Sequence, residues 1–360
     1  MSAHKGMGRH FSPLDKALGL GPRRWSSGAE RVMIQHGLHG PSFEEGAALF
    51  SESVGLVVSG ESVRQVTEGW GKRVAAKRGE EAEALMAGAM AEEAQVQVQD
   101  SLTEAERVNV SSDGGMVRLR EEGWRECKMC VYSEVVVKEV EQEGVEVEGE
   151  ETRLKVHLRR HSYQAGIWEA ETFAKYQYAE GVRRGVQPDA QKMSSVNDGA
   201  LWIERVTRRN YPQATLILDW AHVRQHLSET AESVFGAESE AGKAWCAAQE
   251  EELWYRGPEQ VLATLQRLAQ QQRGNAAQAA QQTYAYLASR REMLAYDSFR
   301  AEGYPLGSGT VESGILTGIH RRMKRQGRGW RKANAQGMLA ALSELQSGRF
   351  QTVWRSLAAS

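Results

Sequence analysis

The chain has 360 residues, of which 26% are charged and 41% are hydrophobic, and it contains 3 cysteines. This length and composition predict two or three folded domains rather than a disordered chain, and so few cysteines exclude a disulfide framework and favour a reducing, cytoplasmic setting. No apolar run approaches the roughly 18 residues of a membrane helix, and no apolar signal region is present, so we expect neither a membrane anchor nor secretion.

The net charge of −2 conceals a strong asymmetry along the chain. Residues 139–151 carry seven glutamates and no basic residue, whereas residues 313–360 carry nine lysines and arginines against the single acid Glu344. Because local fields steer a binding partner, a chain of near-neutral net charge can still bind a polyanion. The basic segment therefore indicates a phosphate-facing surface, although a solvated helix face has the same composition.

The first 107 residues are predicted to form a helical N-terminal region. Residues 1–41 are rich in Gly, Arg and Ser and are expected to be loosely structured, whereas residues 42–75 indicate two helices that begin after Ser42 and Ser59. Two helices joined by a tight connection fit either a DNA-binding helix-turn-helix or a plain helical hairpin. Residues 76–107 are rich in Ala and Glu and indicate a long surface helix.

The sequence pattern changes at residue 108, where β-branched and alternating apolar residues predict strands. Strands are expected over VNVSSDG, GMVRLR, WRECKMCVYSEVVV and about 152–158, with the acidic stretch 138–151 as a connection. A helix over 168–183 is followed by a strand, a helix, a strand and a helix up to residue 235. This succession predicts an α/β domain with a mixed sheet flanked by helices.

Beyond residue 235 the strand signal disappears. Residues up to 300, dominated by Ala, Gln, Glu and Arg, predict an all-helical insertion that ends at YPLGSGTVESG. A helix from near Val311 through the basic cluster and one or two closing helices over 333–357 are expected to follow. The predicted organisation is an N-terminal helical region, the first part of an α/β core, a helical insertion and the last part of the core: residues 1–107, 108–235, 236–300 and 301–360.

Acidic residues at the ends of predicted strands are the first candidates for a reactive site. Asp113 and Asp198 each end a strand, and each precedes a glycine. Reactive groups of α/β sheets gather at the carboxyl ends of strands, where two neighbouring carboxylates repel each other unless a divalent cation lies between them. Ordinary Asp-Gly turn chemistry is the alternative, and the sequence supports both interpretations about equally.

Three further residues extend this candidate site. Glu312 lies at the start of a helix in GSGTVES, although a glutamate in a first helical turn is also favoured by the helix dipole. Asp219 and His222 form a pair in LILDWAH that suits a metal pair or a carboxylate that orients an imidazole. We expect a supporting role for this pair.

Other site chemistries find no support in the sequence. Cys127 and Cys130 lie in a predicted strand, where residues three apart point to opposite faces, so they do not suit a zinc site. The sequence also lacks the Gly-x-Ser-x-Gly elbow of hydrolases, the phosphate-binding loop of nucleotide hydrolases and the glycine fingerprint of dinucleotide-binding folds.

Several sequence blocks occur together in a characteristic order: SSDGGMVRL, GWREC, VNDGALWI, ILDWAHVRQHL and PLGSGTVESGILTGIHRRMKRQGRGW. This combination resembles the Kra-type bacterial insertion-sequence transposases, which belong to the Mutator-like group of DDE transposases. The likeness covers essentially the whole chain, from SPLDKALGLGPRRWSSGAERVM to SGRFQTVW. It implies an RNase H-like core with an N-terminal helical region and an all-α insertion before the last catalytic helix.

The resemblance implies that Asp113, Asp198 and Glu312 are the catalytic acids and bind two Mg²⁺ or Mn²⁺ ions. Asp219 and His222 match the family's Asp/Cys-x-x-His element, which lies beside the active site. Asp219 also ends a strand, but Asp198 is preferred as the second metal ligand because the fourth strand of an RNase H-like sheet lies beside the first. The basic segment would bind DNA phosphates through Arg321, Arg322, Lys324, Arg325, Arg328, Arg331 and Lys332.

The implied activity is cleavage and strand transfer of double-stranded DNA, at transposon ends and target, by a homo-oligomer in the bacterial cytoplasm that associates with the nucleoid. Members of the family often carry a cysteine-rich segment of a zinc-binding type before the SPLD block. The opening MSAHKGMGRHF lacks these cysteines, so we expect the chain to be a truncated copy. Two alternatives stay open: a catalytically inactive, transposase-derived DNA-binding protein, and a metal-dependent nuclease without strand transfer.

Overall fold

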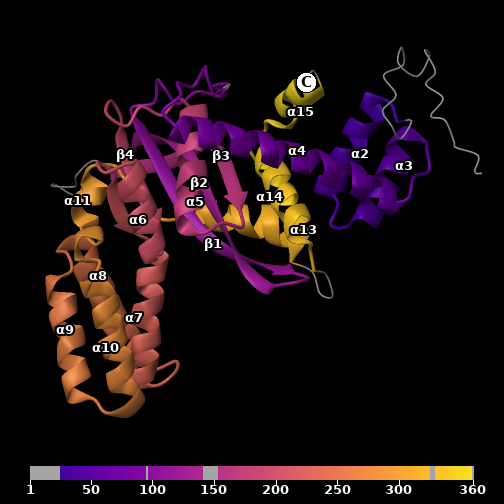
Figure 1. The fold of residues 1–360 in the computed structure, drawn as a ribbon. Helices are drawn as coiled ribbons and strands as arrows, with labels where there is room; N and C mark the ends of the chain where they lie inside the picture. The colour runs from indigo at the N-terminus through magenta and orange to yellow at the C-terminus, as the bar shows by residue number, and fades with distance from the viewer. Residues whose placement is uncertain (1–24, 95, 141–152, 325–328, 359–360) are drawn as a thin grey trace, which may run out of the picture.

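The computed structural model describes residues 25–94, 96–140, 153–324 and 329–358 (Figure 1). Its architecture is mixed α/β, with a five-stranded sheet flanked by helices. The strands are β1 (Arg107–Leu119), β2 (Gly123–Val140), β3 (Arg153–Gly166), β4 (Lys192–Asn197) and β5 (Thr215–Leu218). Among the helices of the described ranges, none is both long and apolar enough to cross a membrane.

The sheet has the strand order β3-β2-β1-β4-β5, so the first strand of the chain lies at its centre. β1, β2 and β3 pair antiparallel, whereas β4 pairs parallel with β1 and β5 parallel with β4. Helix α5 (Ala170–Arg183) connects β3 to β4, α6 (Leu201–Asn210) connects β4 to β5, and α7 (Trp220–Phe235) follows β5. The prediction of a mixed α/β sheet is therefore confirmed.

The central strand differs from the expectation in one respect. β1 continues beyond Asp113, so the prediction that the strand ends there is wrong. A β-carbon on Gly114 would lie 2.3 Å from Oε1 of Glu126, and a β-carbon on Gly115 would lie 2.8 Å from Cγ2 of Ile315. The two glycines thus allow close approach of neighbouring side chains within an extended strand, rather than a turn.

The N-terminal region contains α2 (Ser27–His39), α3 (Phe43–Val54) and α4 (Gly60–Met86). The two helices predicted within residues 42–75 are confirmed, and the hydroxyls of Ser42 and Ser59 cap them by accepting bonds from the backbone N–H groups of Glu45 and Ser62. Of the loosely structured stretch expected over residues 1–41, residues 1–24 lie outside the described part, and α2 occupies most of the remainder.

The long surface helix expected over residues 76–107 is wrong in extent and in exposure. Helix α4 ends at Met86, and the described residues between it and β1 are not helical. One face of the second half of α4 is buried, in large part against α14 (Lys332–Gln346), and Arg78 and Glu81 on this face are 4% and 3% exposed. Their burial is possible because opposite charges from distant parts of the chain meet them.

These charges form what we call the ion network: Arg78, Glu81, Glu180, Arg183, Glu344 and Arg349. Glu344 accepts hydrogen bonds from Nε of Arg78 at 2.6 Å and from Nε of Arg349 at 2.8 Å. Arg349 also donates to Glu180 of α5 at 2.5 Å. The network therefore joins α4, α5 and the C-terminal helices within the protein.

The helical insertion predicted for residues 236–300 is confirmed among the described residues. It contains α8 (Glu240–Tyr255), α9 (Glu259–Gln271), α10 (Gly274–Ala288), the 3₁₀ turn η1 (Arg291–Met293) and α11 (Tyr296–Ala301). Helices α7, α8, α9 and α10 run alongside one another and project away from the sheet (Figure 1). The chain returns to the sheet at Tyr296, whose hydroxyl donates to the carbonyl of Leu218 at the end of β5.

The C-terminal part begins with α12 (Gly309–Ser313), the π-helical segment η2 (Gly314–His320) and α13 (Arg321–Met323). The helix predicted from near Val311 thus exists but ends at Met323, before most of the basic cluster. Helices α14 and α15 (Phe350–Ala358) confirm the closing helices. The largest apolar core lies between the N-terminal helices, one face of β1 and β2, and these C-terminal helices.

Candidate active site

The register of the parallel strands brings three aspartates into one row. The two parallel pairings align one residue from each strand: Asn109, Ser194 and Thr215. Asp113, Asp198 and Asp219 each lie the same number of residues beyond this row, Asp113 within β1 and the other two just past the last paired residues of β4 and β5. Asp198 directly follows β4 and Asp219 directly follows β5, as predicted.

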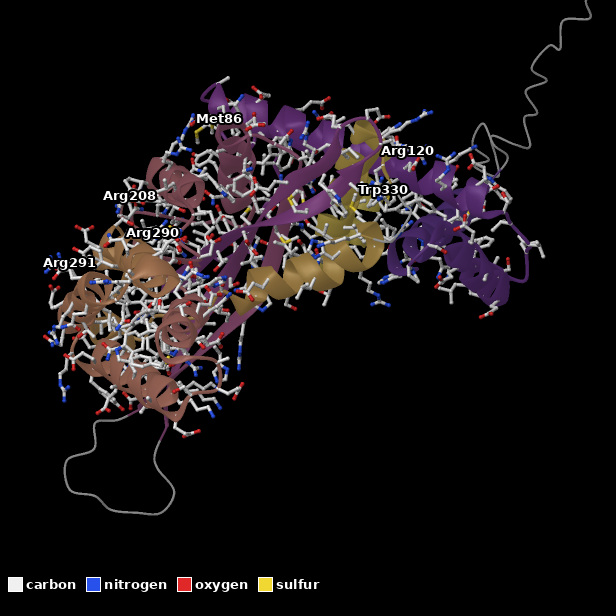
Figure 2. All side chains as sticks on the ribbon, turned by 90° about the horizontal axis from the view of Figure 1, so that it is seen from below. Met86, Arg120, Arg208, Arg290, Arg291 and Trp330 are labelled. Atoms are coloured by element: carbon white, nitrogen blue, oxygen red, sulfur yellow. The ribbon has the colours of Figure 1, made fainter. Side chains whose placement is uncertain are left out.

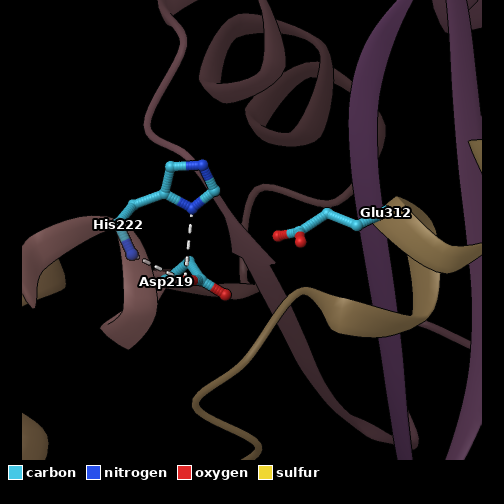
Figure 3. A group of neighbouring side chains, drawn as sticks. All are labelled: Asp219, His222 and Glu312. Carbon is cyan, nitrogen blue, oxygen red and sulfur yellow. Dashed lines mark hydrogen bonds and ion pairs between the residues drawn. The ribbon is translucent and has the colours of Figure 1, made fainter. Parts of the chain in front are cut away.

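Glu312 joins this row from α12. The backbone N–H of Ser308 donates to Oδ2 of Asp219, and the hydroxyl of Ser308 donates to Oε1 of Glu312 at 2.7 Å. One residue of the GSG segment therefore ties Glu312 to the end of β5. Asp219, His222 and Glu312 each offer a ligand atom within 4.8 Å of the other two, and Figure 3 shows the three side chains facing a common space.

Asp219 is fully engaged by the protein. It is 1% exposed, and its Oδ1 accepts bonds from the backbone N–H of His222 at 3.0 Å and from Nδ1 of that imidazole at 3.2 Å. Burial would raise the pKa of Asp219, but the hydrogen bonds from His222 and Ser308 outweigh it and hold the pKa at about 2. Asp219 thus acts as an ionised brace between α7 and the loop before α12.

His222 carries the complementary shift. Its hydrogen bond to Asp219 raises the pKa of the imidazole, and the charges of Glu312 and Asp198 raise it further. Because Asp219 is ionised, Nδ1 of His222 is the nitrogen that donates to it. The pair predicted from Asp-x-x-His therefore exists, and its geometry favours the supporting role.

Asp113 is the acid whose ionisation the site opposes. It is half-buried, and burial raises its pKa to about 6, with further upward contributions from the charges of Asp198 and Glu312. A hydrogen bond from the backbone N–H of Gly114, at 2.6 Å, opposes this shift. The charges of Asp198 and Glu312 thus act on Asp113, whereas the compact group within 4.8 Å in the described chain consists of Asp219, His222 and Glu312.

The loop that carries Asp198 is held by the helical insertion. The hydroxyl of Tyr286 donates to the carbonyl of Asp198 at 2.6 Å, and Nε of Arg290 donates to the carbonyl of Gly199 at 2.8 Å. The guanidinium of Arg290 lies 4.2 Å from the centre of the Tyr286 ring. The ring of His226 packs on the same tyrosine, with 4.1 Å between the two ring centres. The sequence analysis missed these residues because nothing local marks a contact between α10 and a loop so distant in sequence.

The donor set fits a divalent metal. Asp113, Asp198 and Glu312 offer carboxylate oxygens, which Mg²⁺ and Mn²⁺ prefer, and a cation would favour the ionised form of Asp113, which burial and the neighbouring charges disfavour. Asp219 fits less well because its two oxygens already accept hydrogen bonds from His222 and Ser308. Among the described residues, the side chains whose ligand atoms lie close enough together to hold one ion are Asp219, His222 and Glu312, and Asp113 and Asp198 are not part of that compact group.

The predicted DNA-binding residues divide into three groups. Arg325 and Arg328 lie outside the described residues. The exposed members are Arg321, Lys324, Arg331 and Lys332. Arg322 is 2% exposed: its guanidinium lies 4.1 Å from the centre of the Phe43 ring, and Nε donates to the carbonyl of Gly37 at 3.0 Å. The prediction that Arg322 contacts DNA is therefore wrong, since the side chain anchors α13 to the N-terminal helices.

Cys127 and Cys130 lie on opposite faces of the sheet, as predicted. Cys127 belongs to the core between the sheet and the C-terminal helices, and Cys130 to the core beneath α5 and α6. Burial raises the pKa of the Cys127 thiol to about 12, so at neutral pH it behaves as an apolar side chain.

Taken together, the described residues form an acidic site at the carboxyl ends of β4 and β5, braced by an ionised Asp–His pair and by the helical insertion. Neither a protein-family model nor a curated protein matches the chain. The interpretation of its function therefore depends on the chemistry of this site and on the sequence blocks that surround it.

Proposed function

We propose that the chain is a DNA transposase of the Kra-type insertion-sequence group, with an RNase H-like catalytic core. The observation that carries the proposal is the acidic site at the carboxyl ends of β4 and β5: Asp219, His222 and Glu312 lie within 4.8 Å of one another, Asp198 directly follows β4, and Asp113 lies in the strand β1 that pairs with β4. The parallel pairing of β4 with β1 agrees with it, because the fourth strand of an RNase H-like sheet lies beside the first. The all-helical insertion before Glu312 also agrees with the resemblance.

In this proposal Asp113 in the central strand, Asp198 after β4 and Glu312 in α12 would together hold the metal ions. Two Mg²⁺ or Mn²⁺ ions, when bound, would activate the attacking water or DNA 3′-hydroxyl and stabilise the leaving oxygen. The protein contributes position: Ser308 orients Glu312, while Tyr286 and Arg290 hold the loop of Asp198.

The proposed substrate is double-stranded DNA, at transposon ends and at a target. The exposed lysine and arginine side chains around α13 and the start of α14 suit contacts with DNA phosphates. We therefore expect a DNA affinity that falls steeply as the salt concentration rises. We further propose that the protein works as a homo-oligomer on DNA, associated with the nucleoid in the bacterial cytoplasm.

The test uses the full chain with supercoiled plasmid DNA and Mn²⁺ or Mg²⁺. We expect nicked and strand-transfer products that require the cation, and Asp113→Asn, Asp198→Asn and Glu312→Gln should each reduce product at least about a hundredfold. Glu302→Gln, an exposed acid on the connection after α11, is the matched control and should leave activity unchanged.

The same assay separates the alternatives. Cation-dependent cleavage without any strand-transfer product would indicate a nuclease. DNA binding that is indifferent to cations and to Asp113→Asn, with no cleavage, would indicate a catalytically inactive DNA-binding protein.

A further inference from the structure

The hairpin formed by β1 and β2 extends beyond the rest of the sheet. β4 pairs with β1 only over Arg107–Asn109, whereas β2 stays paired with β1 as far as the register Leu119↔Gly123 (Figure 1). One face of this extension is buried: Val117 and Cys127 lie in the large core. The end of the hairpin is therefore a rigid projection with one free face.

The free face carries apolar and basic side chains together. Trp124 is 50% exposed and Met116 is 41% exposed, an unusual exposure for large apolar side chains on a well-paired hairpin. Arg118 is exposed and lies directly across the strand pair from Trp124. Nζ of Lys324, from the end of α13, lies 5.9 Å from the centre of the Trp124 ring. An aromatic ring with cations beside it is a common means of contacting nucleobases and phosphates.

The basic segment after α13 is fastened to this projection. The backbone N–H of Trp330 donates to the carbonyl of Arg118, and the backbone N–H of Arg120 donates to the carbonyl of Trp330, both at 2.9 Å. Nε of Arg120 also donates to the carbonyl of Gly329 at 2.7 Å. Figure 2 shows Arg120 and Trp330 close to each other beside the C-terminal helices. The hairpin and the basic segment thus present one surface.

We call this the hairpin surface: Met116, Arg118, Arg120, Trp124, Lys324 and Arg331. Its charge is positive because most nearby acids are already paired: Glu122 with Arg125 and Lys332, and Glu126 with Lys128. Within the described ranges, no acid forms an ion pair with the four basic side chains of the hairpin surface, which are Arg118, Arg120, Lys324 and Arg331. Of the acids at this end of the hairpin, Glu121 at the turn is the one not paired in this way.

We propose that the hairpin surface binds DNA with unpaired nucleobases. Trp124 stacks on a nucleobase, and the surrounding lysine and arginine side chains contact phosphates. The inference rests on the proposed function for its choice of DNA as the polyanion. An exposed indole favours an unpaired base, since in a duplex the faces of the bases are covered by their neighbours. Arg118 lies roughly 17 Å along β1 from Asp113, at about 3.4 Å per residue, and on the opposite face of the strand, so the hairpin surface is separate from the candidate active site.

The test measures binding by the full chain in EDTA, with fluorescently labelled oligo-dT and with a blunt duplex of the same length. Trp124→Ala should weaken binding of oligo-dT by about fivefold to a hundredfold and change binding of the duplex by much less. Trp124→Phe should restore most of the affinity. Arg118→Ala should lower the salt dependence for oligo-dT by about 0.7 in the log–log slope.

Tyr255→Ala is the matched control, because this aromatic on the helical insertion is 61% exposed and lies away from the hairpin. It should leave binding of oligo-dT unchanged. Each variant is compared with the parent by thermal unfolding, so that a loss of affinity is read only from folded protein. Unchanged affinity of Trp124→Ala for oligo-dT, or an equal loss for duplex and oligo-dT, would overturn the proposal.

Because binding is measured without divalent cations, this test is independent of catalysis. Trp124-dependent binding by a chain that cuts no DNA would support the hairpin surface and contradict the transposase proposal. Cation-dependent strand transfer with unaltered binding by Trp124→Ala would do the reverse.

Discussion

The surroundings of Asp113 and Asp219 shift the pKa values of these two aspartates in opposite directions. Burial and neighbouring carboxylates raise the pKa of Asp113 to about 6, from an ordinary value of 3.8. Asp219 is more deeply buried, yet hydrogen bonds from His222 and Ser308 hold its pKa at about 2. The folded protein thus disfavours the ionised form of one aspartate and favours that of the other, which gives opposite expectations for their replacement by asparagine.

Asp113→Asn should stabilise the metal-free protein at about pH 8, by up to about 1–3 kcal/mol in the free energy of unfolding. The sign follows from linkage: an acid with a raised pKa stabilises the fold below its unfolded value of 3.8, and this is lost as the pH rises through about 6. The gain should therefore vanish near pH 4. Urea unfolding in EDTA at both pH values measures it.

Asp219→Asn is the matched comparison at the same site. Its amide NH₂ would face a donor from either His222 or Ser308, which should lower the free energy of unfolding by about 1–3 kcal/mol at neutral pH. Destabilisation by Asp113→Asn of similar size would show that burial and the neighbouring charges do not disfavour the ionised form of Asp113 as described.

At the scale of elements, the helical insertion supports the site through α10. Tyr286 and Arg290 hold two successive carbonyl groups of the loop that follows β4, and Gly199 in that loop has a φ of 77°, a conformation that suits glycine. An added β-carbon on Gly199 would also lie 2.3 Å from Nε of Arg290. The position of Asp198 thus depends on an element that contributes no acid of its own.

Tyr286→Phe removes the hydroxyl that donates to the carbonyl of Asp198 while keeping the ring that packs against His226 and Arg290. It should raise the Mn²⁺ concentration needed for half-maximal DNA cleavage by roughly tenfold or more, with unchanged affinity for DNA, since groups that orient metal ligands act at about this level. Tyr284→Phe, half-buried on the same helix, is the control. Equal cation requirements in the two variants would refute this role of the insertion.

The sequence predicted the elements well where the pattern was local. The alternation of strands and helices over residues 108–235 and the helical insertion follow from apolar periodicity, and the caps at Ser42 and Ser59 follow from side chains that satisfy the first backbone N–H groups of a helix. The acids that follow β4 and β5 were also identified, because a strand that ends in aspartate is visible within a few residues.

The errors arose where a distant contact decides the outcome. The Asp113-Gly-Gly stretch has the composition of a turn, but Glu126 and Ile315 require the glycines within a continuing strand. Arg322 belongs to a basic cluster by composition, yet the rings of Phe43 and Trp330 receive its guanidinium. Composition cannot show such contacts, since both partners lie far away in the chain.

At the scale of the whole molecule, the ion network links the first and last parts of the chain. Arg78 of α4 and Glu344 of α14 are buried as a pair, and Arg349 connects them to Glu180 of α5. The N-terminal helices also share the large apolar core with the C-terminal ones. The first helices therefore fold against the same core that supports α12, so loss of the network should be felt at the candidate site as well as locally.

The ion network predicts a defined sensitivity to acid. Burial opposes the ionisation of Glu344, but Arg349 and Arg78 outweigh it and hold the pKa of this carboxyl well below its usual range. An acid with a lowered pKa stabilises the fold above its unfolded value of about 4.5, and the stabilisation is lost as the pH falls below that value.

Glu344→Gln should therefore lower the free energy of unfolding at neutral pH by about 3–5 kcal/mol, because it leaves the buried guanidinium groups of Arg78 and Arg349 without this counter-charge. It should also flatten the decline in stability between about pH 5 and pH 3, measured by urea unfolding. Glu252→Gln breaks the surface pair between Glu252 at the end of α8 and the exposed Arg256 that follows it, and should leave stability nearly unchanged at any of these pH values. An acid dependence in Glu344→Gln as steep as in the parent would place the source of acid sensitivity elsewhere in the protein.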